Sequence, residues 1–118
     1  MKLQKSKIWA DITNDQVVVR FLPTSIREMS DAQKVIEEVN EIAYNYHNLK
    51  LMVINFARLK QMTSAFLSKL ITLNKSLAQT GVTLRVCCMT PEVEEAFKIC
   101  KLQKIIPLYA TEEEAIKG

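Results

Sequence analysis

The chain has 118 residues, of which 48% are hydrophobic and 25% are charged. This length suits one domain, so we expect a single domain over residues 1–118, and the composition excludes a disordered chain. There are 16 Lys and Arg residues against 13 Asp and Glu residues, a formal net charge of +3. Because the basic residues are scattered rather than clustered beside aromatic ones, no nucleic-acid surface is predicted.

The N-terminal residues and the overall hydropathy bear on location. Residues 1–7 are basic and lack the apolar core of a signal peptide. No apolar stretch approaches the roughly 18 residues that a membrane-spanning helix needs. We therefore expect a cytoplasmic protein that does not insert into a membrane.

The first half of the chain predicts two strands, a helix and a third strand. A short strand is expected around residues 8–10, and the β-branched run 16–21 predicts a second strand. Ser30 and Gln33 have the spacing of a capping box, and apolar residues then recur at helical intervals as far as Tyr46. The almost continuous apolar run 51–56 is typical of a central strand that is covered on both faces.

The second half continues the alternation. Residues 63–80 predict a helix that a glycine ends, and residues 82–88 predict a strand. A Thr-Pro-Glu start predicts a helix over 90–100, and residues 105–109 predict a short strand. A second capping box at 111–114 begins a terminal helix. The order β-β-α-β-α-β-α-β-α indicates an α/β fold with a mostly parallel sheet and helices packed on it.

The cysteines and the histidine predict no metal or redox site. Cys87, Cys88 and Cys100 contain no C-x-x-C pair, and His47 has no paired ligand in the sequence. We expect all three cysteines to be small apolar fillers in a reducing compartment. If Cys87 and Cys88 lie on one strand, their side chains point to opposite faces.

Features of a catalytic site are also missing from the sequence. The chain has two glycines, so a phosphate-binding glycine-rich loop is excluded. His47 lies at the polar end of a predicted helix, which suits a surface histidine rather than a catalytic base. The acidic run 112–114 is explained by a solvated helix start. We therefore expect a protein that is not an enzyme and needs no cofactor.

The junction between the central strand and the next helix, residues 53–67, is the most informative segment. A buried strand ends, a short loop follows, and Thr63 and Ser64 then lie at a helix N-terminus. Free amides and the helix dipole favour a negative charge there, including that of a phosphate. Alternatively, either hydroxyl simply caps the helix.

This junction resembles a family signature in which a hydrophobic strand leads through a loop into an Asp-Ser-Ser-Gly-Leu motif. Asn55 falls where the family usually carries Asp, and residues 62–67, Met-Thr-Ser-Ala-Phe-Leu, fall on the motif. Further residues match the pattern of the family's C-terminal part: Thr90, Pro91, Glu92, Val93, Phe97, Leu102, Ile106, Leu108, Tyr109, Glu113, Glu114 and Ala115. The chain thus resembles the STAS domains of the anti-sigma-factor antagonist type.

The resemblance implies a STAS-like fold and a bacterial, non-catalytic regulator of transcription. Members of this type dock on a serine-kinase-type anti-sigma factor, which phosphorylates a motif serine to end the binding, and a phosphatase restores it. The usual acceptor falls on Ala65, which has no hydroxyl, so a displaced acceptor at Thr63 or Ser64 and a permanently unphosphorylated surface both stay open. The regulatory region is then 63–65. The residues expected to bind the partner are Arg58, Lys60, Gln61, Met62, Thr63 and Ser64.

Two other functions remain open at this point. One is a STAS-like subunit of a membrane transporter or of a stress-sensing assembly, whose partner would be a transporter ATPase or another STAS chain. The other is a small-molecule or nucleotide sensor that uses the same loop. A thermal-shift screen separates the sensor, because a ligand at 100 times its Kd adds about 2.7 kcal/mol of stability.

Overall fold

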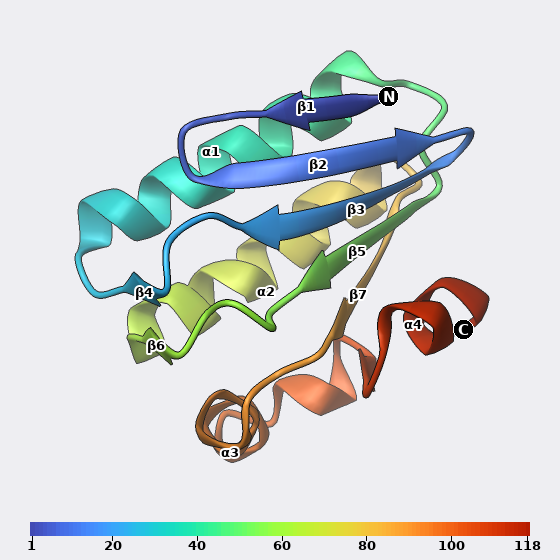
Figure 1. Ribbon diagram of the computed structural model, residues 1–118. Coiled ribbons are helices and arrows are strands. Elements are labelled where there is room, and N and C mark those ends of the chain that lie inside the picture. Colours follow the sequence, from blue (N-terminus) through green and yellow to red (C-terminus); the bar gives the residue numbers. More distant parts are fainter.

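A six-stranded sheet forms the centre of the computed structural model, which describes residues 1–118 (Figure 1). Its strand order is β1-β2-β3-β5-β7-β8, with antiparallel pairing from β1 to β3 and parallel pairing from β3 to β8. A separate two-stranded sheet pairs β4 with β6 in parallel. The strands are β1 Lys2–Gln4, β2 Ile8–Thr13, β3 Gln16–Phe21, β4 Ser25–Ile26, β5 Leu51–Asn55, β6 Gln61–Met62, β7 Thr83–Cys87 and β8 Leu108–Tyr109.

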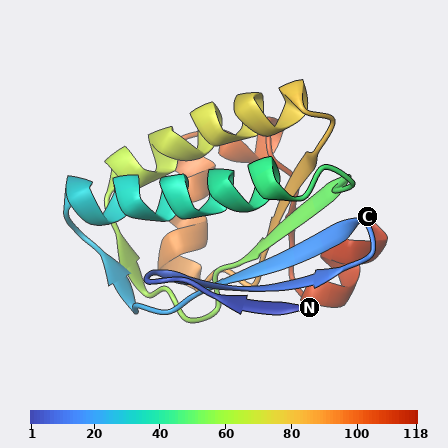
Figure 2. The same ribbon diagram turned by 90° about the horizontal axis from the view of Figure 1, so that it is seen from above.

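Helices lie on both faces of the six-stranded sheet. α1 and α2 run side by side over one face, and α4 packs against β5, β7 and β8 on the other (Figure 2). The helices are α1 Met29–Asn45, α2 Ser64–Gln79, α3 Pro91–Ile99 and α4 Glu112–Lys117, with a short 3₁₀ helix at Leu102–Lys104. None of them is long and apolar enough to cross a membrane.

Side-chain burial explains why these segments form strands at these positions. In β3, Val17, Val19 and Phe21 are buried and alternate with partly exposed residues, as expected for a strand with one covered face. In β5, three consecutive residues, Met52–Ile54, are buried because helices cover both of its faces. The main core contains 29 buried residues between the sheet, α1, α2 and α3. Each large apolar side chain in it contributes about 1.5–3 kcal/mol of burial free energy.

A buried carboxylate fixes α1 to the first hairpin. Glu38 is only 4% exposed and accepts hydrogen bonds from the Ser6 hydroxyl at 2.6 Å and from the Lys7 amide at 2.8 Å. Burial opposes its ionisation, but these hydrogen bonds outweigh that effect and hold the pKa of Glu38 below its ordinary value. Glu38 therefore stays ionised inside the fold, and its hydrogen bonds connect the β1–β2 turn to α1.

The predicted α/β fold with a mostly parallel sheet is confirmed, whereas several local predictions are wrong. The capping box at Ser30 and Gln33 does not form, because the N-cap of α1 is Glu28, two residues before Ser30, and it makes no side-chain cap. The strand expected over 105–109 consists of Leu108 and Tyr109 alone, since the chain before it turns through the 3₁₀ helix. Strands β1, β4 and β6 were not predicted, because two or three residues carry no readable periodicity.

The prediction that all three cysteines are apolar fillers is wrong for Cys100, and the strand predicted over residues 82–88 ends before Cys88. Cys100 is exposed at the C-cap of α3 rather than buried as an apolar filler. Strand β7 ends at Cys87, and Cys88 follows with a φ of 63°, so the two residues do not share one strand. Their sulfur atoms lie 3.3 Å apart and do not point to opposite faces of the sheet.

Candidate functional site

Two buried side chains anchor the segment between β5 and α2. Phe56 and Leu59 are both fully buried, although the residues between and after them are exposed. The ring of Phe56 packs edge to face against the ring of Phe21, with centroids 5.0 Å apart. The ring of Phe66 in α2 also packs edge to face against Phe21, with centroids 6.0 Å apart. The loop is thus tied to β3 and to the first turn of α2.

Backbone hydrogen bonds fix the second half of the same segment. The amides of Lys60 and Gln61 both donate to the carbonyl of Thr24, at 2.8 and 3.3 Å, and the amide of Thr63 donates to the carbonyl of Ile26 at 3.2 Å. These bonds belong to the short β4–β6 pairing (Figure 1). Because the backbone is held on both sides, the side chains of residues 60–63 project from a defined platform rather than a free loop.

The three residues of the predicted regulatory region have different environments. Thr63 is the N-cap of α2, and its hydroxyl accepts a hydrogen bond from the amide of Phe66 at 3.3 Å. Ser64 is the first residue of the helix and is exposed, whereas Ala65 is partly buried. Between the two hydroxyl residues, Thr63 therefore acts as the cap and Ser64 presents the more accessible oxygen.

A polar groove lies between β4, β6 and the start of α3. Its volume is about 630 Å³, and a smaller hollow of about 400 Å³ shares four of its lining residues, so the two form one depression. Arg27 and Lys60 provide positive charge, and Glu92 provides negative charge on the α3 side. The guanidinium of Arg27 donates a hydrogen bond to the side-chain oxygen of Gln61, and both residues line the groove. The lining residues are Thr24, Ser25, Arg27, Lys60, Gln61, Met62, Thr63, Thr90, Pro91, Glu92, Val93 and Ala96.

The residues expected to bind a partner are distributed over two places. Lys60, Gln61, Met62 and Thr63 line this groove, and the exposed Ser64 follows them directly at the start of α2. Arg58 lies instead in a separate hollow of about 550 Å³, together with Trp9, Arg20 and Asn55 among others. Arg58 was predicted to share one surface with residues 60–64, but the burial of Leu59 separates it from them.

The opposite wall of the groove was not predicted as part of a site. Thr90, Pro91 and Glu92 were recognised as a helix start, and the structure confirms Thr90 as the N-cap of α3, accepting from the amide of Val93. The approach of this helix start to Arg27 and Lys60 depends on tertiary packing, so no local pattern signals it. Arg27 itself lies between β4 and α1, in a segment for which no helix or strand was predicted.

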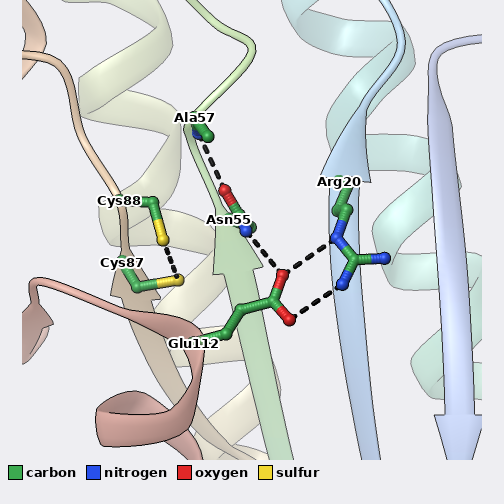
Figure 3. Close-up of polar contacts among 6 residues, drawn as sticks. All are labelled: Arg20, Asn55, Ala57, Cys87, Cys88 and Glu112. Atoms are coloured by element: carbon green, nitrogen blue, oxygen red, sulfur yellow. Dashed lines mark hydrogen bonds and ion pairs between the residues drawn. The ribbon is translucent and has the colours of Figure 1, made fainter.

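A polar cluster joins the C-terminal ends of β3 and β5 to α4 (Figure 3). The carboxylate of Glu112 accepts two hydrogen bonds from the guanidinium of Arg20, at 2.9 and 2.8 Å, and one from the side-chain amide of Asn55 at 2.5 Å. The side-chain oxygen of Asn55 accepts a hydrogen bond from the backbone amide of Ala57 at 2.8 Å. Asn55 therefore uses its donor towards Glu112 and its acceptor towards the loop, which an aspartate at this position cannot do when ionised.

The hydrogen bonds in this cluster determine its charge state. Burial alone raises the pKa of Glu112, but the bonds from Arg20 and Asn55 outweigh it, so the pKa of Glu112 lies below its ordinary value. The hydrogen bond to Glu112 raises the pKa of Arg20. The guanidinium also lies over the ring of Trp9, 4.9 Å from its centroid. The ionised pair thus connects the open face of the sheet to the start of α4.

An α/β domain with a mostly parallel sheet and four helices matches the fold of STAS-like modules. The family model of the STAS domain matches residues 6–115, and the chain belongs to this family.

Solved structures share this fold. An anti-sigma factor antagonist from Mycobacterium paratuberculosis superposes with a TM-score of 0.80 at 18% identity, over 93% of this chain and 90% of that chain. The anti-sigma factor antagonist SpoIIAA in its unphosphorylated form gives 0.76 at 21% identity, over 93% of each chain. The phosphorylated form of SpoIIAA, a Bacillus cell fate determinant, gives 0.68 at 20% identity, over 93% of this chain and 96% of that chain. Comparison with curated proteins finds no significant sequence match.

The hydrogen bond from Asn55 to Glu112 leads to a prediction. Asn55→Asp places a second carboxylate against Glu112, so we expect a loss of about 1–2 kcal/mol in the free energy of unfolding at pH 7. The repulsion raises the carboxylate pKa values in the folded state, so the folded variant binds the extra proton more tightly than the unfolded chain does. The deficit relative to the unmodified protein therefore shrinks as the pH falls through those raised values.

Urea unfolding at several pH values measures this difference. Asn48→Asp is the matched control, because Asn48 is exposed in the turn after α1, and it is expected to change stability by less than about 0.5 kcal/mol. Equal stability of Asn55→Asp and the unmodified protein at pH 7 would show that the Asn55–Glu112 contact contributes nothing.

Proposed function

We propose that this chain is a non-catalytic regulatory module of the anti-sigma-factor antagonist type. It acts in the bacterial cytoplasm, where it docks on a serine-kinase-type anti-sigma factor and so controls transcription. The docking surface consists of the groove between β6 and α3 together with the exposed start of α2. The observation that carries the proposal is the exposed Ser64 at a helix N-terminus directly beside a rigid polar groove.

The construction of this surface supports docking of a protein rather than catalysis. Residues 60–63 project from a backbone that Thr24 and Ile26 hold in place, so little ordering entropy is lost on binding. The lining contains arginine, lysine and glutamate side chains, which suit a complementary charged partner surface. Histidine and cysteine are absent from the lining, so it offers neither of the commonest nucleophile–base pairs.

The position of Ser64 supports regulation by phosphate. A phosphoryl group on the first residue of α2 would be stabilised by the helix dipole and the free amides of the first turn, and the fold would remain intact. The same group would add a charge of about −1.5 to −2 to the docking surface. Thr63 is less suited as an acceptor, because its hydroxyl already caps the helix.

Replacement of Ser64 by an acidic residue tests the docking surface. Ser64→Asp is expected to weaken binding of the kinase-type anti-sigma factor about tenfold or more, which corresponds to about 1.4 kcal/mol, because it introduces a charge into the contact. Asp at the first position of a helix is favourable for the helix itself, so the loss does not arise from unfolding. The tagged protein and the variant are used to recover partners from the source cells, and calorimetry with the recovered kinase measures affinity.

Ser76→Asp is the matched control, since Ser76 is exposed near the other end of the same helix, and it should bind as the unmodified protein does. Equal affinity of the kinase for Ser64→Asp and the unmodified protein would contradict the assignment of the docking surface. Recovery of a transporter ATPase or another STAS chain in place of a kinase would contradict the proposed partner.

The alanine at the usual acceptor position gives a second test. Ala65→Ser restores a hydroxyl at a partly buried position of the first helical turn, and we expect the recovered kinase to phosphorylate this variant at least about tenfold faster than the unmodified chain. The reason is that successive helical residues differ by about 100° in direction, so a kinase aligned on position 65 meets Ser64 poorly. Phosphopeptide mass spectrometry locates the phosphate. Equal phosphorylation rates for the two proteins would contradict this expectation and show that Ser64 fully replaces a serine at position 65 as the acceptor.

A further inference from the structure

Two adjacent cysteines at the end of β7 lie in sulfur–sulfur contact. Cys87 is the last residue of the strand, and its sulfur is 3.3 Å from the sulfur of Cys88 (Figure 3). Cys88 has a φ of 63°, which is the left-handed region that residues other than glycine and asparagine rarely adopt. This turn of the backbone brings the second side chain back to the first, whereas a continued strand would separate them.

The two thiols have different surroundings. Cys87 is fully buried beneath α4, in a small cluster with Val53 and Ala115, and burial, followed by the contact with Cys88, raises the pKa of its thiol well above the ordinary value. Cys88 is only partly buried. An oxidant from solution therefore reaches the sulfur of Cys88 first, and the sulfur of Cys87 is already within reach of it.

We propose that Cys87 and Cys88 form a reversible oxidation site that a hydroperoxide converts into a disulfide between adjacent residues. The Cys88 thiolate attacks the peroxide, the O–O bond breaks, and Cys88 becomes a sulfenic acid as hydroxide leaves and takes up a proton to form water. The sulfur of Cys87 then attacks the Cys88 sulfur, the S–OH bond breaks, and a second water leaves with the thiol proton of Cys87. Two thiols and one hydrogen peroxide thus give one disulfide and two waters.

Formation of this disulfide disturbs the local backbone. Adjacent Cα atoms are about 3.8 Å apart across a trans peptide, whereas disulfides prefer about 4.4–6.8 Å. The peptide between the two cysteines must therefore adjust, although the Cys87 carbonyl is bound to the amide of Phe56 at 2.9 Å and the Cys88 amide to the carbonyl of Tyr109 at 3.2 Å. A disulfide formed under such strain is readily reduced again, which suits a reducing compartment.

The disturbance lies next to the groove. Thr90, the N-cap of α3, is two residues beyond Cys88. Its hydroxyl accepts a hydrogen bond from the amide of Val93 at 3.4 Å, and its carbonyl accepts one from the amide of Glu94 at 2.8 Å. Oxidation moves this helix start and with it the wall formed by Thr90, Pro91 and Glu92. That this movement regulates docking rests on the proposed function, whereas the oxidation itself does not.

The oxidation is tested without a partner, on the variant Cys100→Ser. This substitution removes the exposed thiol of Cys100, so that it cannot form disulfides between chains. With hydrogen peroxide at one equivalent, we expect the protein to lose both remaining thiols and about 2 Da while staying monomeric, and dithiothreitol to reverse this. The double variant Cys88→Ser, Cys100→Ser keeps the buried Cys87 and should show no such loss. Gain of about 16 or 32 Da on Cys88 in place of the loss of about 2 Da would overturn the proposal.

Amide hydrogen exchange tests the structural consequence in the same samples. Oxidation is expected to speed exchange at Val93 and Glu94 at least about tenfold, while the α1 amides far from the site stay unchanged. Unchanged exchange at Val93 and Glu94 in a protein that has formed the disulfide would refute the link to the groove. Both measurements are made on the chain alone, so a failure of the proposed partner leaves their outcome unaffected.

Discussion

The backbone between β5 and α2 is held in place by buried side chains on one side and by the carbonyls of Thr24 and Ile26 on the other. Phe56 and Leu59 fill the core, and the amides of Lys60, Gln61 and Thr63 are bound to Thr24 and Ile26. The position of α2 relative to the sheet follows from this attachment, because Phe66 in its first turn packs against the same Phe21 ring. The groove, the cap at Thr63 and the exposure of Ser64 all depend on that geometry. Rigidity of this kind suits a surface whose signal is the addition or removal of one charge.

The two faces of the sheet place different chemistry at the same edge. On the face of α1 and α2, the C-terminal ends of the strands lead into the groove with its mixed charges. On the face of α4, Asn55 and Glu112 form a closed ionic cluster with Arg20, and the cysteine pair lies beside it (Figure 3). Both sets include residues at or shortly after the ends of β5 and β7. Two residues of chain separate the end of β7 from Thr90, and four separate the end of β5 from Lys60, so a local change at either strand end lies close to the groove.

Strong periodicity made part of this fold predictable. The apolar stripe of α2 and the continuous apolar run in β5 follow from which faces are covered, and the β-branched run in β3 is typical of a strand. The β4–β6 pair was not predictable, because it consists of two residues on each side and depends on Thr24 and Ile26 meeting a distant loop. The separation of Arg58 from Lys60 depends on the burial of Leu59, which the sequence shows only as one apolar residue in a polar loop. The contact of Cys87 with Cys88 arises from a positive φ that no residue preference signals.

Protection from amide hydrogen exchange on binding the kinase-type anti-sigma factor tests the central claim most directly, since it locates the contact without any substitution. The account predicts slower exchange in two segments that are distant in sequence, at Lys60–Leu67 and at Pro91–Glu94, with little change in β1 and β2. These segments are the two walls of the groove and the start of α2. Protection confined to the open face of β1–β3, with both walls of the groove unchanged, would contradict it.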